Sequence, residues 1–251
     1  MLPQNRFDCI IVGGGAAGLM AARTAAEHGR KVLLIERNDR VGKKLAITGK
    51  GRCNVTNNCS DEEFFANIPV GGKFLYSAYS GFNCYDTMEF FESLGVPLKT
   101  ERGSRVFPVS DRAGDIVSAL ERACKKSGVT FLHKRVTEVL AEDNVITGVR
   151  CGGDVYNAMS VLIATGGKSY PGTGSDGDGY RFAAALGHTV TPLKPSLVPL
   201  VSEEGYCGEM TGLSLKNVAV SVMDTSKNKV VFKEQGEMLF THFGVSGPLI
   251  L

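Results

Sequence analysis

Two short apolar runs near the start of the sequence have the pattern of buried parallel strands. Residues 7–12 (FDCIIV) stop at three glycines, and residues 31–36 (KVLLIE) end on an acidic residue. Between them, residues 16–29 are rich in alanine and predict a helix that ends at Gly29. Strand, helix and strand in this order form one βαβ unit, so the pattern predicts an α/β fold with a parallel sheet.

Farther along the chain, the apolar period changes several times between that of a helix and that of a strand. Residues 37–60 lack a regular period and predict an irregular basic loop, whereas residues 61–95 contain several short helical patterns. A pair of strands is expected within residues 98–108, and several more strands between residues 129 and 163.

Two further amphipathic helices are expected, at residues 111–128 and 175–188. Polar side chains stand where the first turn of each helix would need a cap. The expected caps are Ser110 or Asp111 for the first helix and Asp176 or Asp178 for the second.

The pattern of residues changes near residue 191. Three prolines are followed by alternating apolar and polar segments, which predict antiparallel strands of a second module. We therefore expect a first domain at residues 1–190 and part of a β-rich domain at residues 191–251. Residues 246–248 resemble the opening of a helix, and the sequence stops soon afterwards on an apolar run, so we expect a C-terminally truncated chain.

The glycines after the first strand carry the clearest chemical signal. Gly13, Gly15 and Gly18 spell G-x-G-x-x-G between a strand and a helix, and Glu36 ends the next strand. Such glycines permit a tight turn and a close approach of a pyrophosphate, while the acid accepts hydrogen bonds from ribose hydroxyls. This pattern predicts a dinucleotide site; a tight turn beside an unrelated acid is the alternative.

A second strand that ends on small residues favours FAD over a simple nicotinamide cofactor. Residues 161–167 read VLIATGG, and they resemble the strand that FAD proteins bring back against the dinucleotide. The alternative is another buried strand with a glycine-rich turn. The two signals together predict an FAD-binding, Rossmann-like α/β domain.

The segment between these two signals is strongly basic. Within residues 37–52, Asp39 is the only acid among six cations: Arg37, Arg40, Lys43, Lys44, Lys50 and Arg52. A solvated loop is the ordinary explanation, but cations close to a pyrophosphate and a reduced flavin have a stabilising role. No aromatic residue lies between Phe7 and Phe64 to stack on bases, so we expect no nucleic acid here.

Composition and residue spacing narrow the classes of protein to which this chain can belong. The 251 residues carry a net charge of +2 and seven cysteines. No C-x-x-C pair, no metal-ligand spacing of the four histidines and no G-x-S-x-G motif occurs, which disfavours zinc ribbons, metalloenzymes and α/β hydrolases. The apolar run at residues 9–22 is too short to span a bilayer, so we expect a cytoplasmic protein without membrane association.

Several segments resemble one family of bacterial flavoproteins: DCIIVGGGAAGLMAA, GKKLAITGKGRCNVTN, VLIATGGKSYPGTGSDGDGY and GEMLFTHFGVSGP. This is the family of NAD(FAD)-utilising dehydrogenases and aminoacetone-oxidase-like enzymes, which includes 3-dehydro-bile-acid reductases. The resemblance implies a two-dinucleotide-binding-domain flavoprotein fold, interrupted by a β-rich domain near Thr191. It also implies a longer protein whose later segment returns to the flavin.

The resemblance also implies which residues bind the cofactor. Val136 would contact the adenine through its backbone, and Arg52 and Asn54 would lie beside the isoalloxazine. The full predicted set is Gly13, Gly15, Ala16, Ala17, Gly18, Glu36, Arg37, Lys43, Lys44, Gly51, Arg52, Cys53, Asn54, Val136, Ala164, Thr165, Gly166 and Gly167. For Cys53 we expect packing or flavin contact rather than nucleophilic catalysis, although Lys50 and Arg52 are neighbours that could lower its pKa.

We therefore expect an FAD-dependent oxidoreductase in which NAD(P)H is the reductant and the acceptor is an unsaturated or conjugated carbonyl small molecule. A flavin-dependent amine oxidase is an alternative, and no motif in the sequence distinguishes it from the reductase. A non-catalytic flavin- or nucleotide-binding module, or an inactive fragment, is a third possibility. No catalytic residue and no oligomeric state is predicted.

Overall fold

The computed structural model describes residues 6–251 and divides into two compact units. The first unit ends at Val190, and the second comprises Thr191–Leu251. Within the described residues, no helix combines the length and the apolar character needed to cross a membrane.

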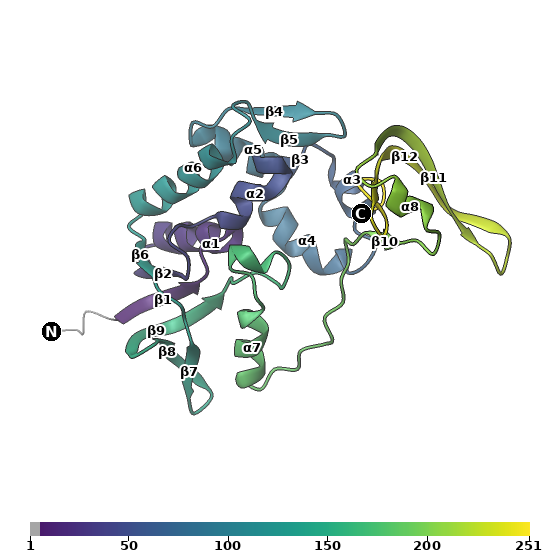
Figure 1. Cartoon of the computed structure of the whole chain (residues 1–251). Coiled ribbons are helices and arrows are strands. Elements are labelled where there is room, and N and C mark those ends of the chain that lie inside the picture. The colour runs from purple at the N-terminus through teal and green to yellow at the C-terminus, as the bar shows by residue number, and fades with distance from the viewer. Residues whose placement is uncertain (1–5) are drawn as a thin grey trace. The chain divides into compact units, whose positions relative to one another are not determined.

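The first unit is built on a six-stranded sheet with the order β6-β2-β1-β9-β8-β7 (Figure 1). The first four strands in this order are parallel, and β8 and β7 continue the sheet in antiparallel fashion. Their bounds are β1 Arg6–Val12, β2 Val32–Glu36, β6 Thr130–His133, β7 Glu138–Glu142, β8 Val145–Cys151 and β9 Asp154–Ile163. The predicted parallel α/β sheet is confirmed.

Alternating side chains of the central strands enter two different cores. Ile11 and Leu34 pack on one face against α1 (Ala16–Glu27) and α6 (Ala113–Lys126). Ile10 and Leu33 point to the other face, where they form a second core with Phe182 of α7 (Asp178–Ala185) and with residues of β7, β8 and β9 of the same sheet. Figure 1 shows α1 and α7 on opposite sides of β1 and β9. Both faces are therefore dry, which explains why these strands read as continuous apolar runs.

A smaller antiparallel sheet, with the order β3-β5-β4, lies next to α5 and α6 in the first unit. Its strands are β3 Thr56–Asn57, β5 Arg105–Pro108 and β4 Leu98–Glu101. Three helices, α3 Asp61–Ala66, α4 Gly72–Gly81 and α5 Cys84–Ser93, fill the sequence between β3 and β4, as the short helical patterns predicted.

The second unit is a four-stranded antiparallel sheet with the order β10-β13-β12-β11 and one short helix. Its elements are β10 Leu200–Val201, α8 Tyr206–Glu209, β11 Ser214–Asp224, β12 Lys229–Thr241 and β13 Gly244–Ser246. The predicted antiparallel strands are present. The expected opening of a helix at residues 246–248 starts one residue later: Ser246 ends β13, which pairs with β12, and the carbonyl oxygen of Gly247 accepts from the N–H groups of Ile250 and Leu251 at 3.0 and 3.1 Å.

The expected irregular loop at residues 37–60 contains a helix, α2 (Lys43–Gly51). The sequence conceals it because its last turn is not helical: Thr48 is extended and Gly49 and Lys50 are left-handed. Leu45 packs against the core that contains Ile11, so burial of one side chain, rather than a long apolar period, holds this helix.

The expected side-chain caps are also replaced. Helix α6 follows Arg112 without a side-chain cap, because the Asp111 carboxylate accepts instead from Lys99 Nζ at 2.7 Å. Helix α7 follows Gly177, whose φ is +94°, and Asp178, its first residue, pairs with Arg135. The Asp176 side chain accepts from the N–H of Asp178 at 3.3 Å, so Asp176 partly fills the expected capping role from one residue before Gly177. Tertiary ion pairs have taken over carboxylates that local pattern assigned to helix termini.

Candidate functional site: a dinucleotide cavity at the sheet edge

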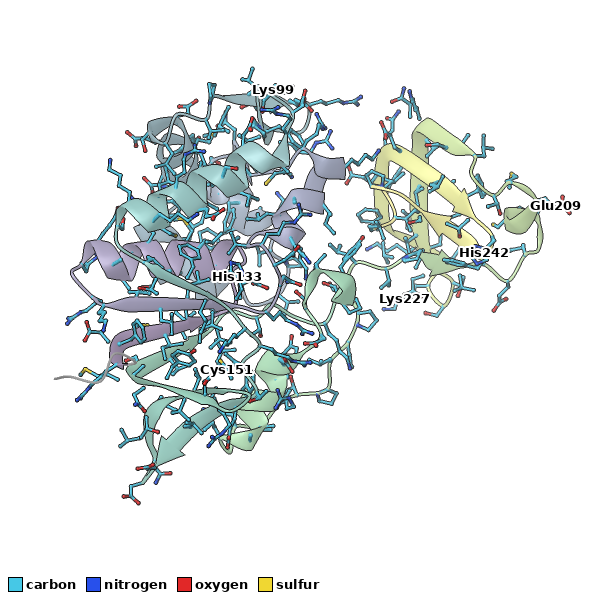
Figure 2. The ribbon with its side chains drawn as sticks, turned by 60° about the vertical axis from the view of Figure 1, so that its left-hand side comes forward. Lys99, His133, Cys151, Glu209, Lys227 and His242 are labelled. Atoms are coloured by element: carbon cyan, nitrogen blue, oxygen red, sulfur yellow. The ribbon has the colours of Figure 1, made fainter. Side chains whose placement is uncertain are left out.

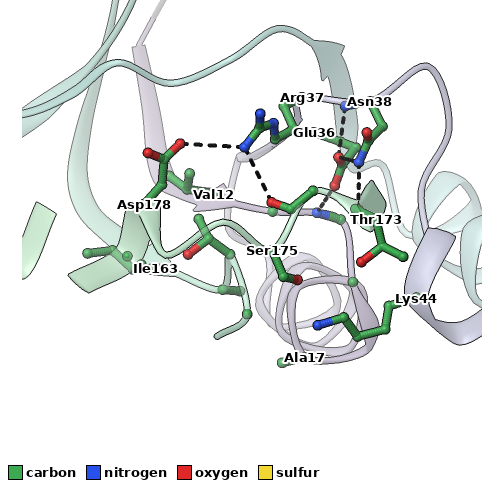
Figure 3. A pocket seen from close by; sticks show the side chains of 18 of the residues that line it. Val12, Ala17, Glu36, Arg37, Asn38, Lys44, Ile163, Thr173, Ser175 and Asp178 are labelled. Carbon is green, nitrogen blue, oxygen red and sulfur yellow. Dashed lines mark hydrogen bonds and ion pairs between the residues drawn. The ribbon is translucent and has the colours of Figure 1, made fainter. Parts of the chain in front are cut away.

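A cavity of about 740 Å³ opens at the carboxyl ends of β1, β2 and β9 (Figure 3). Ligands of α/β sheets bind at this edge, and the volume is within the usual range of small-molecule sites. Thirteen predicted residues line it: Gly13, Gly15, Ala16, Ala17, Glu36, Arg37, Lys43, Lys44, Val136, Ala164, Thr165, Gly166 and Gly167.

The three glycines of the motif are required for different structural reasons. A Cβ on Gly13 would overlap the carbonyl oxygen of Ala164, and one on Gly18 would overlap the carbonyl oxygen of Gly13. A Cβ on Gly15 would meet no protein atom within 4 Å. Gly13 and Gly18 therefore bring β1, β9 and α1 together, whereas Gly15 leaves space at the N-terminus of α1, inside the cavity.

Glu36 stands at the end of β2 with 7% of its surface exposed. Its Oε2 accepts from the backbone N–H of Gly14 at 2.7 Å. Its Oε1 accepts from the backbone N–H of Asn38 at 2.8 Å and from Asn38 Nδ2 at 2.6 Å. The carboxylate is thus fixed against the glycine turn while it lines the cavity, where it can accept a ligand hydroxyl.

The cations around the cavity are not equivalent. Arg37 pairs with Asp176, and this hydrogen bond holds the pKa of the Asp176 carboxyl below its ordinary range. Lys43 pairs with Asp39 at 3.0 Å. Lys44 donates to the backbone carbonyl of Ser169 at 2.9 Å, and it is the one cavity-lining cation in residues 6–251 with no carboxylate partner. Lys44 therefore has a positive charge available for an anionic ligand.

The wall after β9 contains an unsatisfied polar group. The Oγ1 of Thr165 is buried and has no hydrogen-bond partner. The next residue, Gly166, has a φ of +75°, and a Cβ there would approach Ser175 Oγ to 2.7 Å. The cavity therefore offers an unpaired hydroxyl on Thr165, an ammonium without a carboxylate partner on Lys44, and open space at Gly15. These features fit an extended ligand that carries phosphates and hydroxyls, such as FAD.

Five of the predicted residues do not line this cavity: Gly18, Gly51, Arg52, Cys53 and Asn54. The Arg52 guanidinium donates to Glu101 at 2.9 Å and stacks over the Phe107 ring at 4.0 Å. Asn54 lies next to β3 in the small sheet. Contact of these residues with the isoalloxazine stays a prediction.

Cys53 is 1% exposed and has a left-handed φ of +64°. Burial raises the pKa of its thiol, against the lowering that neighbouring cations suggested. A buried thiol with a raised pKa is a poor nucleophile, in agreement with the expected packing role.

Sequence reasoning missed several lining residues, of which Asn38 and Ser175 are the most informative. Asn38 lies outside every motif, and Ser175 lies within the segment VLIATGGKSYPGTGSDGDGY without being singled out there. A polar residue just after β2 and a glycine-rich run at residues 172–177 were the available signals, and each is common in ordinary loops. Among the described residues, no group of His, Cys, Asp and Glu side chains has the arrangement of a metal site.

Comparison with known proteins agrees with this geometry. The HI0933-like protein Rossmann domain matches residues 7–247. The chain is 34% identical to a ribosomal RNA dihydrouridine synthase of Escherichia coli, over 99% of this chain and 60% of that protein. It is 32% identical to a 3-dehydro-bile acid delta(4,6)-reductase of Clostridium scindens, over 97% of this chain and 58% of that protein. The chain thus spans about three-fifths of the length of these relatives.

Solved structures show the same fold at lower identity. A flavocytochrome c3 fumarate reductase superposes with a TM-score of 0.54 at 21% identity, covering 86% of this chain and 48% of that one. A 3-ketosteroid-delta4-(5alpha)-dehydrogenase of Rhodococcus jostii gives 0.53 at 20% identity, covering 66% and 47%. The fold is thus the predicted Rossmann-like α/β fold of FAD-binding flavoproteins, and the chain belongs to the HI0933-like Rossmann-domain family, which includes FAD-dependent oxidoreductases.

Proposed function

We propose that the protein is an FAD-dependent oxidoreductase that uses NAD(P)H to reduce a carbon–carbon double bond conjugated with a carbonyl group. The observation that carries the proposal is the cavity at the carboxyl ends of β1, β2 and β9, which combines a glycine turn, a buried acid and a cation free of carboxylates. Bound FAD would supply the hydride chemistry, which no protein side chain provides.

The residues present suit the parts of this cofactor. The free N–H groups at the start of α1 and the Lys44 ammonium would bind the pyrophosphate. The Glu36 carboxylate would accept from a ribose hydroxyl, and Val136 would border the adenine. The protein's part is therefore to bind and orient the cofactor and to exclude water from its polar groups.

The proposed acceptor class follows from what the relatives' names share. A delta(4,6)-reductase acting on a 3-dehydro-bile acid and a synthase that forms dihydrouridine both describe saturation of a carbon–carbon double bond. In both cases a carbonyl group conjugated with that bond would favour hydride addition. A small conjugated carbonyl compound is the acceptor we propose first.

A uridine of ribosomal RNA is the second candidate acceptor, and it is favoured by the relative with 34% identity. RNA binding normally requires an excess of cations along the phosphate backbone. Residues 191–251 contain five lysines, no arginine and six carboxylates, so this unit offers no such excess. For this reason we place the small molecule first and expect no RNA partner.

The test uses the purified protein saturated with FAD under anaerobic conditions. We expect NADH or NADPH to bleach the flavin, and a steroid with a 3-oxo-Δ4,6 system to restore its colour. Restoration by ribosomal RNA, with dihydrouridine in the digested product, would establish the second candidate instead. Colour restored only by oxygen, after bleaching by a small amine, would identify the oxidase alternative. A protein that retains no FAD would refute the proposal.

A further inference from the structure

Asn38, which no motif singled out, makes hydrogen bonds to four other residues: Glu36, Thr173, Lys43 and His133. It lies two residues beyond Glu36, at the end of β2, and lines the cavity. Its backbone N–H and its Nδ2 both donate to Glu36 Oε1, at 2.8 and 2.6 Å. Two donors from one residue therefore converge on a single oxygen of the buried acid.

The orientation of the Asn38 side chain is itself fixed from three sides. Its Nδ2 also donates to the carbonyl oxygen of Thr173 at 3.1 Å, and its Oδ1 accepts from Lys43 Nζ at 3.3 Å. The backbone carbonyl oxygen of Asn38 accepts from His133 Nδ1 at 2.7 Å. His133 stands at the end of β6 and is labelled in Figure 2. Figure 3 shows the side chain between Glu36 and Thr173. A rotated side-chain amide would lose its bonds to Glu36, Thr173 and Lys43, so one orientation is selected.

The acceptor sites of the Glu36 carboxylate can now be assigned. A carboxylate has about four lone-pair positions. Asn38 occupies two positions on Oε1, and the N–H of Gly14 occupies one on Oε2 at 2.7 Å. One position on Oε2 is left for a ligand. Because Glu36 lines the cavity, a hydroxyl-bearing ligand bound there would use that position.

We propose that Asn38 is the positioning residue of the cofactor site: it holds the Glu36 carboxylate so that its remaining lone pair accepts from a hydroxyl of the adenosine ribose. The proposal rests on the proposed function, because it takes the ligand to be FAD. Asn38 acts through Glu36 and is not a catalytic residue. It also ties Glu36 to Thr173, so the acid and the turn at Pro171–Thr173 are fixed together.

The experiment compares two probes that differ only in the ribose hydroxyls, ADP and 2′,3′-dideoxy-ADP, as competitors of FAD. In the unaltered protein we expect ADP to bind roughly 10-fold or more tightly than the dideoxy probe, as a hydrogen bond to a charged group predicts. In Asn38→Ala this ratio should fall towards one. The matched control is Asn67→Ala, because the Asn67 side chain donates to the carbonyl of Glu63 outside the cavity.

Asn38→Asp supplies a second readout that a merely structural role would not move. It places two carboxylates about one hydrogen bond apart, and such a pair shares a proton at a raised pKa. FAD affinity of Asn38→Asp should therefore be weak at pH 8 and recover as the pH falls towards 5.5, because the protonated carboxyl again donates to Glu36. The same titration of Asn67→Asp should follow the unaltered protein.

The outcomes separate this inference from the proposed function. Failure of the unaltered protein to bind FAD or ADP refutes both. Normal FAD binding with an unchanged probe ratio in Asn38→Ala, or a pH-independent affinity in Asn38→Asp, overturns only the role of Asn38. If Asn38→Ala does not fold, the ratio and pH profile of the near-isosteric Asn38→Asp decide the question.

Discussion

At the scale of single residues, the glycines of the G-x-G-x-x-G motif are required for different physical reasons. Gly18 is needed because a side chain would overlap the Gly13 carbonyl, whereas Gly15 faces open space in the cavity. The first is a requirement of packing and the second a requirement of ligand approach. The sequence pattern alone does not distinguish them, but substitution can.

We expect Gly15→Val to weaken FAD binding by at least about tenfold without loss of stability, because its side chain would project into the ligand space. Gly18→Ala should instead lower the free energy of unfolding by about 1–3 kcal/mol, as an overpacked site does. FAD titration and chemical denaturation of both variants check this. Equal effects of the two substitutions on both quantities would contradict the assignment.

Cys53 allows a second prediction at this scale. Because the Cys53 thiol is buried whereas Cys59 is partly exposed, native protein should react with iodoacetamide at Cys59 well before Cys53. Cys53→Ala should keep flavin reduction within about tenfold, far from the loss that a covalent nucleophile causes. Mass spectrometry of the labelled protein gives the order. Rapid native labelling of Cys53 would argue for a reactive role.

At the scale of elements, the strands and long helices were predictable, because apolar period and glycine breaks are local properties. Helix α2 and the caps of α6 and α7 were not. Each depends on contacts outside its own segment. Leu45 of α2 packs against the main core, the Asp111 carboxylate binds Lys99, and the Asp176 carboxylate binds Arg37. At these three places tertiary contacts therefore overrode local propensity.

The pairing of Arg37 with Asp176 predicts an acid-sensitive contribution to stability. The pKa of the Asp176 carboxyl is lowered in the folded state, so its contribution is complete above the unfolded pKa of about 3.9 and is lost as the pH falls through the lower folded value. Asp176→Asn should therefore reduce the free energy of unfolding at pH 7, and the difference from the unaltered protein should shrink below pH 4.

Denaturation followed by circular dichroism between pH 7 and pH 3 measures this difference. Asp154→Asn is the control, because Asp154 pairs with Lys134 outside this network and 54% of its side chain is exposed. A difference for Asp176→Asn that stays constant down to pH 3 would show that the ion pair does not stabilise the fold.

At the scale of the whole molecule, the contact pattern separates the unit that ends at Val190 from Thr191–Leu251. Residues 189–199 contain no helix or strand, and they include three prolines. Such exposed connecting segments are preferred sites of proteolysis. The predicted cofactor residues all precede this segment.

Limited proteolysis with chymotrypsin should therefore cut first near Leu193 or Leu197, which are 47% and 74% exposed. We expect the N-terminal product to retain FAD through gel filtration, because every residue that lines the cavity lies before residue 184. The absorption spectrum of the separated fragments checks the expectation. Flavin that leaves both fragments would show that residues beyond the cut hold the cofactor.

By itself, the sequence determined the βαβ unit, the glycine turn with Glu36 and the strand that returns at residues 161–167, because each depends on neighbours along the chain. Only the tertiary structure decided which charges around the cavity are free and how Glu36 is held. Asn38 meets Thr173 across 135 positions, and Arg37 meets Asp176 across 139. Contacts at such separations form only when the sheet brings its strand ends together, so no local pattern records them.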